Sequence, residues 1–136
     1  MEGAALQSNC SVLIVDPLEE TREVLKTALS RRGMRTLCAA KASLGLDLAR
    51  RHHPDLIVLD VELAGQTDPA GSEDLAGAFA EQADRDAASL VMLGTARRQS
   101  KPASGEFVAK PYHYGPLIRR IEEMLGSASP GEVRRG

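Results

Sequence analysis

The hydrophobic pattern of the chain is made of short, unbroken runs of aliphatic residues, and the clearest of them, 56–59, ends at Asp60. An unbroken run, in contrast to an alternating one, is typical of a strand that is covered on both faces, as in a parallel sheet. The pattern therefore predicts a central strand at 56–60 and an edge strand where the apolar content is lower. The other four predicted strands are 11–15, 34–39 (the edge strand), 89–93 and 106–109.

Apolar residues at helical spacing separate these runs and predict four helices. The first helix fits an N-terminal capping box, with Asp16 as the cap, Pro17 in the first turn and Glu19 closing the box. The second helix is expected to be buried through Leu44 and Leu48. The predicted helices are 17–32, 43–52, 72–82 and 116–126.

Strands that alternate with helices indicate a doubly wound α/β fold. We expect a flavodoxin-like, five-stranded parallel sheet with the strand order 2-1-3-4-5. The segment 97–105 carries no apolar stripe, so the helix between strands 4 and 5 is predicted to be shortened or absent. Residues 9–126 are predicted to form one domain, with flexible tails at 1–8 and 127–136.

Length and charge narrow the range of functions. The 136 residues are enough for one domain with its own core. A net charge of -2 gives no electrostatic reason to expect nucleic acid or an anionic membrane as a partner, and no apolar run is long enough to cross a bilayer. Cys10 and Cys38 fall at opposite ends of neighbouring predicted strands, beyond disulfide distance. We therefore expect a cytoplasmic protein with reduced cysteines that binds neither membrane nor nucleic acid through this domain.

Four chemically active side chains directly follow four of the predicted strands. They are Asp16, Asp60, Thr95 and Lys110. Because the carboxyl ends of parallel strands meet at one edge of the sheet, this fold gathers all four in one crevice. Two carboxylates can hold Mg²⁺, which prefers few protein ligands together with water and phosphate oxygens, and a hydroxyl and an ammonium can bind a phosphoryl group. The set is therefore suited to phosphoryl chemistry.

With these residues the chain resembles the receiver domain of two-component response regulators, over roughly 10–125. The matching segments are 12–16, 54–60, 95–96 and 107–111. Each segment is weak evidence alone, but their order and spacing together are specific. The resemblance implies a signalling protein in a two-component or phosphorelay pathway, with no enzymatic activity beyond self-phosphorylation and autodephosphorylation.

The resemblance also implies a role for each residue. Asp60 accepts a phosphoryl group from a phosphohistidine of a histidine kinase or a histidine phosphotransfer protein, and Lys110 and Thr95 bind that group. Thr95 and Phe107 form the switch that reports phosphorylation to a downstream protein. The metal site holds Mg²⁺ through Asp16, Asp60 and Glu62. The peptide bond between Lys110 and Pro111 is expected to be cis.

The chain departs from the family pattern in three places. The family has a second acidic residue after strand 1, which binds the metal, but here Pro17 occupies that position. Glu19, Glu20 or the Glu62 side chain can replace it, and Mg²⁺ binding is expected to be weaker, on the order of tenfold or more. The shortened connection before strand 5 removes part of the family's usual output face, and the loop at 61–71 is longer than the usual turn.

Other functions remain open at this point. Asp16 fits a helix cap as well as a metal ligand, and Phe107 fits a plain packing role. Because of Pro17 and the shortened connection, an alternative is a pseudo-receiver that acts as a protein interaction module without phosphorylation. A flavodoxin-like cofactor enzyme is a weaker alternative, since the acidic residues after strand 1 would repel a phosphate and no glycine-rich loop is present there.

Overall fold

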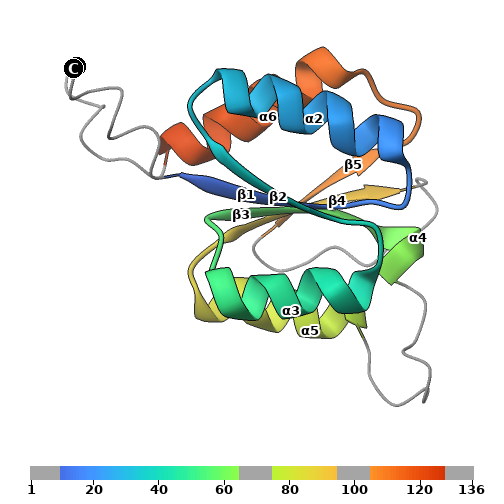
Figure 1. The fold of residues 1–136 in the computed structure, drawn as a ribbon, viewed down its shortest axis with the longest axis vertical. Helices are drawn as coiled ribbons and strands as arrows, with labels where there is room; N and C mark the ends of the chain where they lie inside the picture. Colours follow the sequence, from blue (N-terminus) through green and yellow to red (C-terminus); the bar gives the residue numbers. More distant parts are fainter. Residues whose placement is uncertain (1–9, 65–74, 95–104, 128–136) are drawn as a thin grey trace.

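The computed structural model describes residues 10–64, 75–94 and 105–127. They form a five-stranded parallel sheet between two layers of helices (Figure 1). The strands are β1 (Ser11–Val15), β2 (Arg35–Ala39), β3 (Leu56–Asp60), β4 (Ser89–Gly94) and β5 (Gly105–Ala109). The helices are α2 (Glu19–Arg31), α3 (Ala42–His52), α4 (Val61–Ala64), α5 (Leu75–Arg85) and α6 (Tyr114–Ser127).

The strand order is β2-β1-β3-β4-β5, with all neighbours parallel. This confirms the predicted flavodoxin-like fold and places the switch in strand order between β1 and β3. All five residues of β3 are buried, as the unbroken apolar run predicted. The β1–β3 register pairs Val15 with Leu59. As a result, the residues that follow these two, Asp16 and Asp60, come to the same edge of the sheet.

The strands alternate their side chains between two cores. On one face, α3 and α5 pack against Leu13, Val15 and Leu59, with Phe79 as the largest buried side chain. On the other face, α2 and α6 pack against Val12, Ile14 and Val58. Figure 1 shows these two helical layers on opposite sides of the sheet. Covering both faces is what allows the strands to be aliphatic throughout.

One sequence prediction about the helices is wrong and another is only partly right. α2 begins at Glu19 with Leu18 at the cap position and no side-chain cap hydrogen bond, so the capping box does not form. α3 buries Ala42, Gly45, Leu46 and Ala49. Leu48 is half-buried and packs against the core as predicted, whereas Leu44 is 48% exposed. The reason is that Gly45 lets α3 approach the sheet so closely that an added Cβ would lie 2.7 Å from a Val15 methyl. Three small residues and Leu46 therefore form the inner face of α3, and Leu44 points away from it.

Other predictions agree with the described residues. Cys10 and Cys38 are free thiols, and burial is the main reason that the pKa of each is raised. The Lys110–Pro111 peptide bond is cis. In the described ranges, no helix has both the length and the apolar character needed to cross a membrane. The predicted tails, apart from Ser127, and the connection predicted to lack a helix lie outside the described residues, so those predictions stay untested.

Candidate functional site

Two buried carboxylates stand side by side at the carboxyl edge of the sheet. Asp16 directly follows β1 and Asp60 is the last residue of β3, and they are only 1% and 2% exposed. They are there because β1 and β3 are paired neighbours that end in register. Two ionised carboxylates in such a place repel each other and are poorly hydrated, so the site requires a compensating cation.

Lys110 supplies a positive charge to this pair. Its Nζ donates to the Asp60 Oδ2 atom at 2.6 Å. The backbone holds Lys110 in place, because its N–H donates to the Gly94 carbonyl at the end of β4. Burial by itself lowers the pKa of Lys110, but the hydrogen bond to Asp60 and the nearby acidic charges outweigh it and raise this pKa above its ordinary value. The lysine is therefore a fixed cation at neutral pH.

Asp16 is held by its own turn. The Leu18 N–H donates to Asp16 Oδ1 at 2.9 Å, which explains why this aspartate does not cap the helix as predicted. Burial raises the pKa of Asp16, and the charge of Asp60 raises it further, although the Leu18 hydrogen bond, Lys110 and Arg22 partly oppose the shift. The carboxylate is thus under electrostatic strain that a bound cation would relieve.

Arg22 is a site residue that the sequence reasoning missed. Its Nη1 donates to the carbonyls of Asp16, at 2.9 Å, and Pro17, at 3.1 Å. The arginine lies in the first turns of α2 and reaches back over the loop. It fixes the backbone that carries Asp16 and adds positive charge next to the two acids. The only sign in the sequence was the position of Arg22 in the helix predicted directly after the first strand.

A pair of half-buried tyrosines lies at the start of α6. Tyr114 Oη lies 3.2 Å from Thr21 Oγ1 of α2, and the rings of Tyr112 and Tyr114 meet edge to face at 5.8 Å. Burial and the negative charge of Asp16 raise the pKa of Tyr112 to about 12. Both tyrosines also pack against the core under α2 and α6. The effect of the two acids on the pKa of Tyr112 was not predicted from the sequence.

The remaining predicted site residues are only partly described. Phe107 is half-buried and packs against the α3–α5 core. Glu62, on α4, is exposed, and no three carboxylate, histidine or cysteine side chains of the described ranges are arranged to hold a metal ion. Thr95 lies outside the described residues. Among the described residues, the structure thus brings Asp16, Asp60 and Lys110 together, and Glu62 lies close enough for its negative charge to raise the pKa of Lys110.

The oxygen donors that are present fit the chemistry of Mg²⁺. Asp16 and Asp60 are hard anionic ligands, and Mg²⁺ commonly binds one or two carboxylates and keeps several waters. Burial, and to a smaller extent the charge of Asp60, raise the pKa of Asp16, and a cation bound to this carboxylate would favour its ionised form. The donor set therefore fits this ion through two side chains, and Pro17 adds no side-chain ligand.

Comparison with known proteins places this geometry in context. No family model matches the chain. The polar-differentiation response regulator DivK of Brucella ovis is 27% identical over 123 residues, which cover 87% of this chain and 98% of DivK. The transcriptional regulatory protein AfsQ1 of Streptomyces coelicolor is 44% identical over 55 residues, which cover 40% of this chain but only 24% of AfsQ1.

Solved structures agree with these sequence matches. The receiver domain of the TMAO respiratory system response regulator TorR superposes with a TM-score of 0.70 at 18% identity, covering 87% of this chain and 98% of the TorR domain. At 18% identity the match to TorR shows a similar fold only. The match to DivK shows that the sequence is similar as well. Over most of its length the sequence is similar to a response regulator, and the fold is similar to that of a response regulator receiver domain.

Proposed function

We propose that this chain is a phospho-accepting receiver domain in which Asp60 takes a phosphoryl group from a phosphohistidine. The observation that carries this proposal is the ion pair of Lys110 with Asp60, at 2.6 Å, beside a second buried carboxylate. A carboxylate that served only the fold would not need a buried acidic neighbour, because that neighbour makes its burial less favourable.

In the proposed reaction, an oxygen of Asp60 attacks the phosphorus of the phosphohistidine. A P–O bond forms while the P–N bond breaks, and the leaving imidazole keeps the electron pair and takes up a proton. Lys110 stabilises the negative charge on the phosphoryl oxygens, because its ammonium is already fixed at the accepting carboxylate. The hydroxyl of Thr95 is proposed to bind the product, and Phe107 to respond to it.

Mg²⁺, when bound, would neutralise charge on the phosphoryl group. Asp16 and Asp60 would hold it, with Glu62 as the remaining proposed ligand. Arg22 fixes the turn that carries Asp16 through two carbonyls, so these main-chain oxygens are already engaged. With Pro17 in the place of an acid, we expect Mg²⁺ affinity to be on the order of tenfold weaker than in sites with the second acid.

The proposed partners follow from this chemistry. The donor is a histidine kinase or a histidine phosphotransfer protein in the cytoplasm, and the output is a downstream protein that recognises the phosphorylated form. The relatives DivK and AfsQ1 are named as a response regulator and a transcriptional regulator. For this chain, signalling by phosphorylation is favoured over an interaction module that does not use phosphate, because the Asp60–Lys110 pair is intact.

The test is phosphorylation with a small phosphodonor, such as phosphoramidate, at increasing Mg²⁺ concentrations, followed by intact mass. Wild-type protein is expected to gain one phosphoryl group that hydroxylamine removes, as an acyl phosphate requires. Asp60→Asn is expected to gain none. Asp47→Asn, which changes an exposed aspartate on α3, is the matched control and should be labelled normally.

Two results would reject the proposal. Wild-type protein that stays unmodified even at high Mg²⁺ would leave the phosphorylation-independent module as the better reading. Equal labelling of Asp60→Asn would show that another residue accepts the group.

A further inference from the structure

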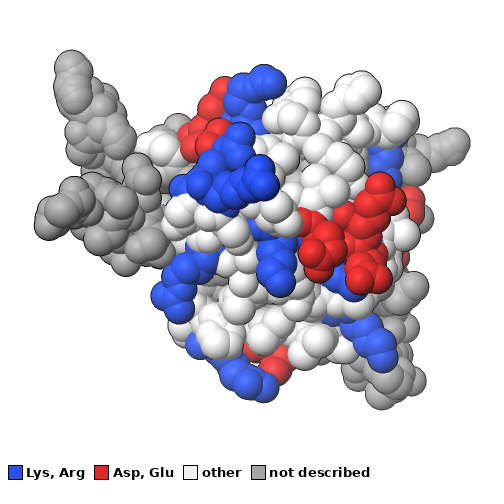
Figure 2. All heavy atoms as spheres, turned by 45° about the horizontal axis from the view of Figure 1, so that its top comes forward, with Lys and Arg blue, Asp and Glu red and all other residues white. Residues whose placement is uncertain are grey.

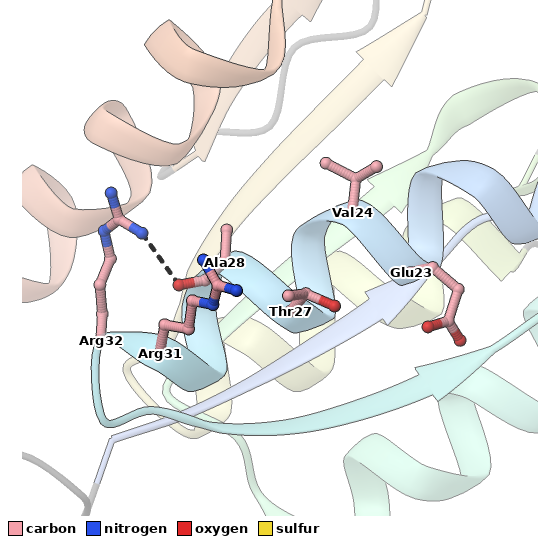
Figure 3. A pocket seen from close by; sticks show the side chains of 6 residues that line it. All are labelled: Glu23, Val24, Thr27, Ala28, Arg31 and Arg32. Atoms are coloured by element: carbon pink, nitrogen blue, oxygen red, sulfur yellow. Dashed lines mark hydrogen bonds between the residues drawn. The ribbon is translucent and has the colours of Figure 1, made fainter.

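The outer face of α2 carries an open hollow that the proposed phosphoryl chemistry does not use. Its volume is about 430 Å³. We name this surface the α2 face, and it is lined by Glu23, Val24, Thr27, Ala28, Arg31 and Arg32. Figure 3 shows these side chains along one helix. Val24 and Ala28 are half-buried, whereas Glu23, Thr27 and Arg31 are exposed, so the hollow has a small apolar floor between charged ends.

The charges on the α2 face are ordered along the helix. Glu23, Thr27 and Arg31 are spaced by four residues and therefore form one stripe, with the acid at one end and the base at the other. In Figure 2 a cluster of acidic side chains lies to the right on this side of the molecule, with basic side chains to its left and also below it. The order agrees with the helix dipole, but it also creates a surface with two opposite ends.

The two charged ends of the stripe have no ion-pair partner among the described residues. Arg32, by contrast, is neutralised by Glu122 of α6 at 2.6 Å and donates to the Ala28 carbonyl at 2.9 Å. Glu23 and Arg31 thus present opposite charges to solvent on either side of a small residue, Thr27. Such a surface is available to a partner with the reverse order of charges.

We propose that the partner is a second copy of this chain, bound through antiparallel packing of the two α2 faces. Glu23 and Arg31 each lie four residues from Thr27, about 6 Å along the helix axis. A two-fold axis through Thr27 therefore sets Glu23 of each copy opposite Arg31 of the other copy, and the pairing forms twice. An isologous interface requires this self-complementarity, and the small Thr27 and Ala28 side chains allow close approach.

The interface is small. A helix of 13 residues spans about 20 Å, so one helix face buries less than the roughly 1,200 Å² typical of stable complexes. The dimer is therefore weak, it forms at high protein concentration, and added salt dissociates it because the pairs are exposed. This inference does not depend on phosphorylation of Asp60.

Sedimentation equilibrium over a range of protein concentrations, at low and high salt, tests the inference with charge-reversal variants. Glu23→Arg alone and Arg31→Glu alone each place like charges opposite each other twice, and each is expected to weaken the dimer by about tenfold or more. The double variant Glu23→Arg/Arg31→Glu restores both pairs and is expected to dimerise like wild type. An equimolar mixture of the two single variants is expected to form the heterodimer.

The matched controls are Glu81→Arg and Arg85→Glu, which reverse exposed charges on α5, on the other side of the sheet. They should leave the association constant unchanged. Wild-type protein that remains monomeric at millimolar concentration and low salt would overturn the inference. So would a dimer that survives both single reversals, since the contact would then lie elsewhere.

Discussion

Lys110 and Asp60 are 50 positions apart in the sequence, yet the lysine Nζ lies 2.6 Å from the aspartate Oδ2. β3 and β5 carry them to the same edge of the sheet, with β4 between the two strands. This pairing links the stability of the fold to the chemistry proposed for the site. It can be tested by removing either charge.

Lys110→Met removes the cation while keeping most of the aliphatic stem. At pH 7 it leaves Asp60 buried without its ion-pair partner, and the free energy of unfolding is expected to fall by about 2 kcal/mol. The pKa of Lys110 is raised in the folded state. Its contribution to the free energy of unfolding is therefore fully present below about pH 10.4, which is the pKa of an unfolded lysine. This contribution is lost only as the pH rises through the folded-state pKa. At pH 7 the wild-type lysine is therefore fully charged.

Urea unfolding at pH 7 and at alkaline pH measures this loss. The loss should shrink as the pH rises through the raised pKa of Lys110, because the wild-type lysine then also loses its charge. Lys26→Met, at an exposed position on α2, is the control. An equal loss at both pH values would mean that packing of the lysine stem, and not the charge, is responsible.

Asp16→Asn is expected to stabilise the protein at pH 7. Because burial raises the pKa of Asp16, its favourable contribution exists only below its unfolded value of about 3.9 and is lost as pH rises through the folded value. At pH 7 the wild type therefore carries the cost of a buried charge. Asparagine removes it and still accepts the Leu18 N–H, for a gain of about 1 kcal/mol.

The gain should disappear as the pH falls toward 3.5, and Mg²⁺ binding should weaken at all pH values. Asp47→Asn at an exposed site is the control for a general effect of charge. If the variant is less stable than wild type at pH 7, the interactions of the ionised Asp16 carboxylate stabilise the fold by more than its burial costs.

Tyr112→Phe should change the pH dependence of the protein's stability only in the alkaline range. The pKa of Tyr112 is raised to about 12, so its contribution is present below the unfolded value of about 10 and is lost as pH rises through 12. Between these values the free energy of unfolding should fall less steeply for Tyr112→Phe than for wild type. Ultraviolet titration should also show the late-ionising phenol in wild type and in the control Tyr114→Phe, but not in Tyr112→Phe.

Gly45→Ala tests the close packing of α3 on the sheet. The added methyl would lie 2.7 Å and 2.9 Å from the Val15 methyls and 3.2 Å from Phe79 Cζ. Overpacking costs about 1–3 kcal/mol, and alanine returns about 1 kcal/mol of helix propensity, so a net loss of about 1 kcal/mol is expected in urea unfolding.

Gly115→Ala is the matched control, because nothing lies within 4 Å of an added Cβ there. It should be neutral or stabilising. A double-mutant cycle with Val15→Ala should show coupling, since the shorter side chain leaves room for the methyl. If the effects of the two substitutions on the free energy of unfolding are additive, the contact between the added methyl and Val15 is not the cause of the loss.

Part of the site could be predicted because strand ends are visible in a sequence. Asp16, Asp60 and Lys110 each follow an apolar run, and parallel strands bring their carboxyl ends to one edge. The prediction failed where the outcome depended on a single contact. Asp16 matched a helix cap by spacing, but its oxygen accepts from Leu18 before the helix begins. Arg22 was missed because nothing in the adjacent sequence shows that its side chain reaches back to the carbonyls of Asp16 and Pro17.

The sequence by itself determined the five strands and their alternation with helices, because aliphatic runs and helical spacing are local properties of the chain. The fold that this alternation indicates then gave the edge at which the two acids and the lysine meet. Only the tertiary structure decided which face of α3 is buried, how Asp16 is held and why Tyr112 ionises late. Those features arise from distances between segments far apart in the chain. Such distances depend on how closely the helices pack on the sheet, which the pattern of polar and apolar residues does not encode.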